Sequence, residues 1–152
     1  MHFLSSTLRL AGFSLGLVFA ATALASEESQ LIESINLYRG QLQRCAGQVS
    51  SELPPLSADP RLVLSAASVG NLQQAMASAG YPMKNVQAIS LNGPRDAPSA
   101  MKAIQESFCQ IVLDPQFVDV GVSRQDREWR IVLAHPLLSA RLGDWKKKKK
   151  KM

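Results

Sequence analysis

The spacing of apolar residues after residue 25 begins with a helix-like pattern. Leu31, Ile35, Tyr38, Leu42 and Cys45 recur at intervals of three or four, so they share one face of a helix. Acidic residues 27 and 28 would lie in its first turn, where their negative charges interact favourably with the positive end of the helix dipole. The pattern predicts a first helix from about residue 27 to residue 44.

Two further apolar stripes predict helices. Asp59-Pro60 supplies an N-cap and a first-turn proline for the second, which Gly80 ends and Gly70 could split. Asp96 caps the third, which stops at Asp114-Pro115. The buried stripe of the second is Leu62, Ala66, Val69, Leu72, Met76 and Ala79, and that of the third is Met101, Ile104, Phe108 and Ile111.

Strand-like alternation appears in three places. Residues 87–91 form a short candidate strand that Asn92-Gly93-Pro94 ends. Apolar and polar residues then alternate over 118–123 and again over 129–133, with a turn at 125–127 between them. The order is therefore helix, helix, strand, helix and hairpin.

The first 25 residues have the features of a secretory signal peptide. Arg9 precedes an apolar run of 12 residues, 10–21, and Ala23-Leu24-Ala25 offers the small-x-small pattern that a signal peptidase accepts. A membrane anchor is the alternative, but a bilayer span needs about 20 apolar residues. We expect cleavage between Ala25 and Ser26, which leaves enough chain for one domain, residues 26–140.

The net charge of +5 comes from the C-terminus. Residues 26–145 hold 10 Lys and Arg against 12 Asp and Glu, and these arginines are scattered, so the domain has no nucleic-acid footprint. Residues 141–152 predict a disordered tail, because a run of like charges repels itself, and this tail could contact an anionic surface or have no partner. The run is Lys146, Lys147, Lys148, Lys149, Lys150 and Lys151.

Export would place the two cysteines, Cys45 and Cys109, in an oxidising compartment. A disulfide between them would close a long loop, and two buried free thiols are the alternative. A reduced Cys109 activated by His135 would be a possible nucleophile and base pair. His135 stands at a strand end beside Pro136, which favours a surface histidine instead.

Four segments of the chain carry motifs of a known family. They are Asn36-Leu37-Tyr38-Arg39, Leu56-Ser57-Ala58-Asp59-Pro60-Arg61-Leu62, Gly80-Tyr81 with Val86-Gln87-Ala88-Ile89, and residues 108–123 with Asp114-Pro115-Gln116-Phe117 and Asp119-Val120-Gly121-Val122. In this order and with these cysteine positions, they resemble the CAP superfamily, the SCP-like family of cysteine-rich secretory, antigen 5 and pathogenesis-related proteins. The resemblance implies an α-β-α sandwich, an α+β fold with three main helices and a short antiparallel sheet. The cysteines of bacterial members occupy places that imply a Cys45–Cys109 bridge.

The chain departs from the family at its cleft. Many members line a central cleft with two histidines and two acidic residues, which can hold a metal. Here the second helical region has no histidine, Gln87 stands at a glutamate position, and Phe108 stands at the last histidine position. We therefore expect no metal, no cofactor and no catalytic residues. The acids Asp114, Asp119, Asp126 and Glu128 lack the regular spacing of a calcium loop, and Asp114 with Pro115 is a helix stop.

These features predict an exported CAP-like domain that acts without catalysis. It would serve as a binding or interaction module in the periplasm or outside the cell. The alternative is a lipid-binding or envelope-associated protein that uses an apolar groove and the lysine tail. A hydrolase with atypical residues is a third hypothesis, which the single histidine of the mature chain disfavours.

Overall fold

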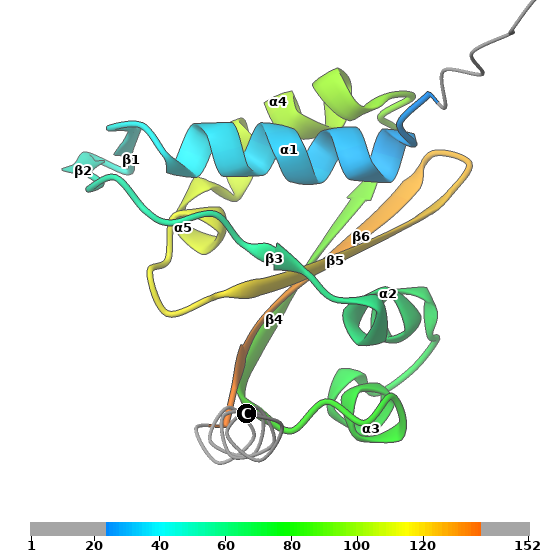
Figure 1. Cartoon of the computed structure of the whole chain (residues 1–152). Helices are drawn as coiled ribbons and strands as arrows, with labels where there is room; N and C mark the ends of the chain where they lie inside the picture. Colours follow the sequence, from blue (N-terminus) through cyan, green and yellow to red (C-terminus); the bar gives the residue numbers. More distant parts are fainter. Residues whose placement is uncertain (1–23, 138–152) are drawn as a thin grey trace, which may run out of the picture.

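The computed structural model describes residues 24–137, and it has three layers (Figure 1). A central sheet has the strand order β3-β5-β6-β4, with helices on both of its faces. Its strands are β3 (Ser57–Ala58), β4 (Met83–Asn92), β5 (Asp119–Gln125) and β6 (Glu128–Pro136). The α+β sandwich that the sequence predicts is confirmed.

The sheet is mixed, whereas the sequence predicts a short antiparallel one. β4, β5 and β6 pair antiparallel, but the two-residue β3 runs parallel to β5 at the edge. The hairpin turn lies where it is expected, and Asp126 has a positive φ of 55° there, a conformation that Asp tolerates in turns. β4 is twice as long as predicted, because its first residues also pair with the end of β6.

The first face of the sheet is covered by α1 (Glu27–Arg39), α4 (Ala97–Ser107) and α5 (Cys109–Val112). Leu31 and Ile35 are buried in this core as predicted. The prediction that α1 extends to residue 44 is wrong, because the helix ends at Arg39 and Gly40 caps it. Leu42 is therefore exposed, and Cys45 lies in the two-residue β1 (Arg44–Cys45), paired with β2 (Gln48–Val49).

The second face is covered by α2 (Pro60–Ala67) and α3 (Leu72–Ser78). Asp59 caps α2 as predicted, and the second helical region is split at Gly70 into two helices, the break that the sequence allowed. Gly70 has a φ of +112°, which other residues rarely adopt, and Asn71 then caps α3. Val69 therefore lies in the connection and is fully exposed, so its predicted burial is wrong.

The third helical region is also interrupted. α4 ends at Ser107, and Phe108 leaves helical geometry with a φ of −133° before α5 begins. Phe108 and Ile111 are half-buried and pack against the edge of the first core, so the prediction that both share one fully buried helix face is wrong. Met101 and Ile104 are buried as predicted.

Within residues 24–137 no helix is long and apolar enough to cross a membrane. The predicted signal peptide up to residue 23 and the predicted tail at 141–152 lie outside the described residues. Of the predicted cleavage pair, Ser26 is the N-cap of α1, and its hydroxyl accepts a hydrogen bond from the amide of Ser29.

Candidate functional site

The two family cleft positions lie on the first face of the sheet. Gln87 is opposite Leu133 in the β4–β6 register, so it shares that residue's face, and it is exposed. Phe108 packs against the same core from the junction of α4 and α5. A neutral amide and a phenyl ring offer neither a carboxylate nor an imidazole, so these positions supply no general acid or base and no imidazole ligand for zinc.

Arg39, from the Asn-x-x-Arg segment, has a structural position. Its side chain is only 1% exposed. Its guanidinium donates to the carbonyls of Pro54 at 3.3 Å, Val112 at 2.7 Å, Asp114 at 3.3 Å and Phe117 at 3.3 Å. Burial lowers the pKa of Arg39, while the charge of Asp114 opposes that shift. The buried cation is thus satisfied by backbone acceptors and joins three segments of chain.

Asn36 of the same segment holds the chain before β3. Its side-chain amide donates to the carbonyl of Leu56 at 3.1 Å and accepts from the amide of Leu56 at 2.8 Å. One side chain therefore replaces a pair of strand hydrogen bonds. Both polar residues of the segment serve the fold.

Cys45 and Cys109 form a disulfide, with their Cα atoms 5.9 Å apart. This is the pairing that the family resemblance implies, and it links β1 to the start of α5. Because the sulfur of Cys109 is bonded, it cannot act as a nucleophile with His135. His135 is half-buried, and its Nδ1 lies 2.6 Å from the carbonyl oxygen of Gln116.

The acidic residues singled out in the sequence do not gather. Among residues 24–137 no three metal-ligating side chains form a group. Asp114 accepts a hydrogen bond from the amide of Gln116 at 3.0 Å, the turn role that the sequence predicts. Asp126 is in the hairpin turn, and Asp119 accepts from the hydroxyl of Tyr81 at 2.6 Å.

Tyr81 and Asp119 belong to a polar cluster beside α2. Arg61 lies over the Tyr81 ring at 4.8 Å from its centre and forms an ion pair with Asp59 at 2.7 Å. Burial, and then the hydrogen bond to Asp119, raise the pKa of Tyr81 far above its usual value. A hydroxyl that stays protonated is a donor and not a base, so this cluster connects α2 to the sheet without offering acid–base chemistry.

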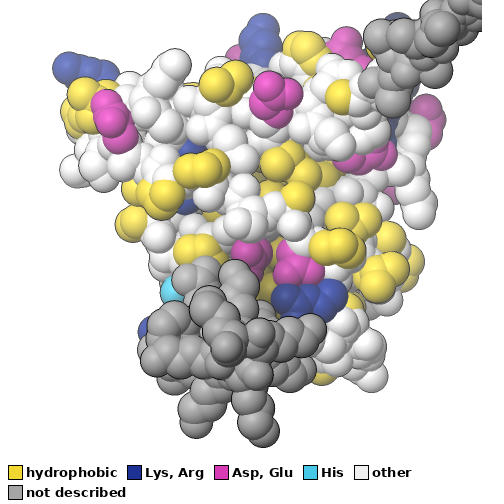
Figure 2. Space-filling model, in the orientation of Figure 1, with side chains coloured by type: hydrophobic (Ala, Val, Ile, Leu, Met, Phe, Trp, Pro, Cys, Tyr) yellow, Lys and Arg dark blue, Asp and Glu magenta, His cyan; other side chains and the backbone are white. Residues whose placement is uncertain are grey.

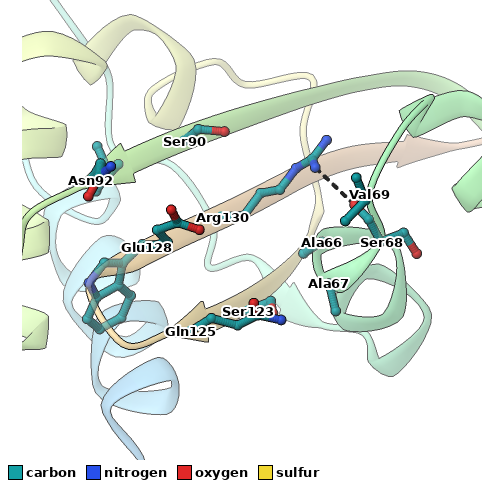
Figure 3. Close-up of a pocket in the computed structure, with 12 residues that line it drawn as sticks. Ala66, Ala67, Ser68, Val69, Ser90, Asn92, Ser123, Gln125, Glu128 and Arg130 are labelled. Carbon is teal, nitrogen blue, oxygen red and sulfur yellow. Dashed lines mark hydrogen bonds between the residues drawn. The ribbon is translucent and has the colours of Figure 1, made fainter.

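A pocket of about 330 Å³ opens on the second face of the sheet, at its hairpin end (Figure 3). Gly121 lets α2 lie directly on β5, because a β-carbon there would overlap the backbone of Leu62. α2 then ends at Ala67, so the sheet beyond it has no helix over it. The lining residues are Ala66, Ala67, Ser68, Val69, Ser90, Leu91, Asn92, Ser123, Gln125, Glu128, Trp129 and Arg130.

Two polar rows cross the three strands beneath this pocket. In the first row Arg130 of β6 stands between Ser90 of β4 and Ser123 of β5. In the second row Glu128 stands between Asn92 and Gln125. Side chains two residues apart on a strand share a face, so both rows point into the pocket.

Arg130 is the charged group at the inner end of the pocket. Its Nη1 donates to the carbonyl of Ser68 at 3.0 Å, and Figure 3 shows the guanidinium reaching from β6 toward the end of α2. Its Nε is buried without a hydrogen-bond partner. The ion pair found within residues 24–137 is that of Arg61 with Asp59, so Arg130 has no carboxylate partner there. A buried donor without a partner is unusual and can be satisfied by a ligand.

This pocket was not predicted from the sequence. A signal was present in two of the three strands, since polar residues alternate with apolar ones at Ser90-Leu91-Asn92 and at Glu128-Trp129-Arg130, whereas β5 ends in the polar run Ser123-Arg124-Gln125. Alternation of polar and apolar residues predicts only that one face of the sheet is exposed to solvent. Only the early end of α2 turns that side into a pocket.

Comparison with solved structures finds bacterial proteins of similar fold, including the following two. An extracellular protein containing an SCP domain from Bacillus anthracis aligns with a TM-score of 0.61 and 15% identity, over 72% of this chain and 40% of that one. A cysteine-rich secretory protein from Staphylococcus aureus aligns with a TM-score of 0.59 and 15% identity, over 72% of this chain and 38% of that one. The chain has the SCP-like fold.

The chain spans less than half the length of either structural relative. Searches against family models and against curated proteins find no match. The resemblance predicted from the four segments is thus confirmed at the level of the SCP-like fold. Within that fold, the Arg130 pocket and the Gln87 and Phe108 positions lie on opposite faces of the sheet.

Proposed function

We propose that the protein is an exported, non-enzymatic SCP-like domain that binds a small molecule in the Arg130 pocket. The observation that carries this is the guanidinium of Arg130, which has a buried, unpartnered Nε beside a cavity of about 330 Å³. That volume is at the lower end of the range for small-molecule sites.

The chemistry of the lining supports binding rather than catalysis. Hydroxyl, amide, guanidinium and single carboxylate groups line the pocket, and no imidazole or thiol does. An unactivated serine is a weak nucleophile, because it needs an adjacent base to accept its proton. The two polar rows also do not fit the apolar groove that lipid binding would require.

Export is supported by two observations. The two structural relatives described above are an extracellular protein and a cysteine-rich secretory protein. The Cys45–Cys109 disulfide is the kind of bond that persists in oxidising compartments. We place the protein in the periplasm or outside the cell.

Equilibrium dialysis against a small-molecule extract of bacterial envelopes tests the proposal. Mass spectrometry should find at least one compound retained by the purified protein and lost with Ser123→Phe, which fills the pocket from β5. Gln48→Phe, at an exposed position of β2, is the matched control and should retain the compound. Equal retention by all three proteins, or by none, would contradict a binding role for this pocket.

A further inference from the structure

The pocket carries one basic and one acidic group, and they are set apart. Arg130 and Glu128 are two residues apart on β6, so their Cα atoms are about 7 Å from each other. Figure 3 shows both side chains on the same side of β6. They form no ion pair, although they share the pocket.

The inner end of the pocket suits a carboxylate. A guanidinium presents several N–H donors in a plane, which matches the two oxygens of a carboxylate. Ser90 and Ser123 flank Arg130 in the register and add hydroxyl donors, and neither hydroxyl has an intramolecular partner within the described chain. Burial of the Nε strengthens the attraction, because solvent screens it less.

The outer end suits an ammonium group. Glu128 is exposed, and Asn92 and Gln125 beside it offer amide oxygens. The pocket's lining has no net charge, since one guanidinium faces one carboxylate. A phosphate or another polyanion would meet repulsion from Glu128 and find only one cation.

We infer that the pocket binds a small zwitterion, with its carboxylate on Arg130 and its ammonium group toward Glu128. Amino acids and similar short amino carboxylates are the chemical class. This inference rests on the proposed binding function and names the ligand chemistry of the same pocket.

A series of ω-amino acids tests this inference. The chain length that binds best measures the distance between the carboxylate subsite at Arg130 and the ammonium subsite at Glu128. The probes are glycine, β-alanine, γ-aminobutyrate, 5-aminopentanoate and 6-aminohexanoate, with acetate, ethylammonium and inorganic phosphate for comparison. Each is titrated into the ¹⁵N-labelled full chain, and dissociation constants come from amide shifts around Ser90 and Ser123. At least one zwitterion should bind 10-fold or more tightly than any of the three comparison compounds.

The variants assign each charge. Arg130→Gln and Glu128→Gln should each weaken the best zwitterion at least 10-fold, whereas Arg130→Lys should weaken it less because it keeps the charge. Arg127→Gln and Glu106→Gln remove exposed charges outside the pocket and should change nothing. The amide spectra also show whether each variant is folded. If Arg130→Gln is not folded, the affinity of Arg130→Lys is compared with that of the original protein instead.

Three results would overturn the inference: no zwitterion in the series shifts these amides, acetate or phosphate binds as tightly as the best zwitterion, or both glutamine variants bind as the original does. If the dialysis experiment retains a compound without an ammonium group and Ser123→Phe loses it, the binding function stands and the zwitterion assignment falls.

Discussion

The guanidinium of Arg39 donates to the carbonyl of Val112 at 2.7 Å, across 73 residues of sequence. This contact joins the C-terminal end of α1 to α5. The Cys45–Cys109 disulfide joins the same two regions a few residues away. A covalent bond and a buried cation therefore hold one end of the helical layer together.

Replacing Arg39 with methionine should destabilise the protein by about 3 kcal/mol or more. The substitution leaves the carbonyls of Val112 and Phe117 buried without a donor, and each unsatisfied group costs about 1–3 kcal/mol. Urea denaturation measures the change. Arg44→Met, at an exposed position, is the control and should remain within about 0.5 kcal/mol of the original. A similar result for both variants would contradict the role of Arg39.

The purified protein should contain no free thiol. Alkylation before reduction should leave its intact mass unchanged, and alkylation after reduction should add two groups, on Cys45 and Cys109. The double serine variant should lose about 4 kcal/mol of stability on the chain-entropy model, because the bond closes a long loop. Labelling of both thiols without reductant would refute the bridge.

Phe108→Ala should cost about 2 kcal/mol. A fully buried phenylalanine costs about 3–5 kcal/mol when truncated, and Phe108 is half-buried at a helix junction. Ile104→Ala, on the buried face of α4, should cost more in the same denaturation experiment.

Phe108→His should not create a zinc site. Gln87 carries no charge, and His135 already contacts the carbonyl of Gln116, so the introduced imidazole would be alone. Calorimetry with zinc on the original and on the variant measures this. Tight binding by either protein would mean that the family cleft still holds metal ligands.

Tyr81 should make the protein less stable in alkali. The pKa of Tyr81 is raised in the folded state, and a tyrosine in the unfolded chain titrates near 10. Its contribution is complete below pH of about 10 and is lost as the pH rises above that value, because only the unfolded chain then releases the proton. Urea midpoints from pH 7 to 11 should fall less steeply for Tyr81→Phe than for the original.

Tyr38→Phe is the control for that experiment. Burial alone raises the pKa of Tyr38, with no carboxylate bonded to its hydroxyl. In Tyr38→Phe the urea midpoint should still fall between pH 7 and 11 by most of the amount seen for the original protein. Equal slopes for the original protein and Tyr81→Phe would show that Tyr81 is not the responsible group.

Binding to anionic vesicles should depend on Lys146–Lys151, which raise the charge of the chain after residue 25 from −2 to +4. Exposed charges are screened within about 8 Å at physiological ionic strength, so binding should weaken steeply with salt and vanish when the run is deleted. The face drawn in Figure 2 gives no comparable attraction, since Lys and Arg side chains are interspersed with Asp and Glu side chains on it. Salt-resistant binding after the deletion would place the site elsewhere.

The fold could be predicted in large part from local signals. Caps at Asp59 and Asp96 began helices where expected, and alternation located the hairpin. The ends of α1 and α4 were missed, because a three-to-four spacing continues through Leu42 and Phe108 although the helical backbone does not. An apolar stripe records side-chain spacing only. The break that the sequence did allow, at Gly70, has a positive φ that glycine adopts readily.

The candidate site was harder to predict, because it lies on the part of the sheet that α2 does not cover. Arg130 is 40 residues from Ser90 and 62 residues from Ser68 in sequence. Strand register brings Ser90 and Ser123 beside it, and the end of α2 brings Ser68. The buried state of Arg39 was missed for a similar reason: its acceptors are backbone carbonyls, which no side-chain motif reveals.

Because α2 ends at Ala67, its length determines how much of the sheet is left open and therefore the volume of the pocket. One more turn of about four residues in place of the Ser68–Asn71 connection would extend the helix by roughly 5 Å over Ser123 and Arg130. Short insertions or deletions there would thus close or widen the cavity without altering a strand. Proteins with this sheet could gain or lose a ligand through changes in loop length alone, while the strand residues of the pocket stay the same.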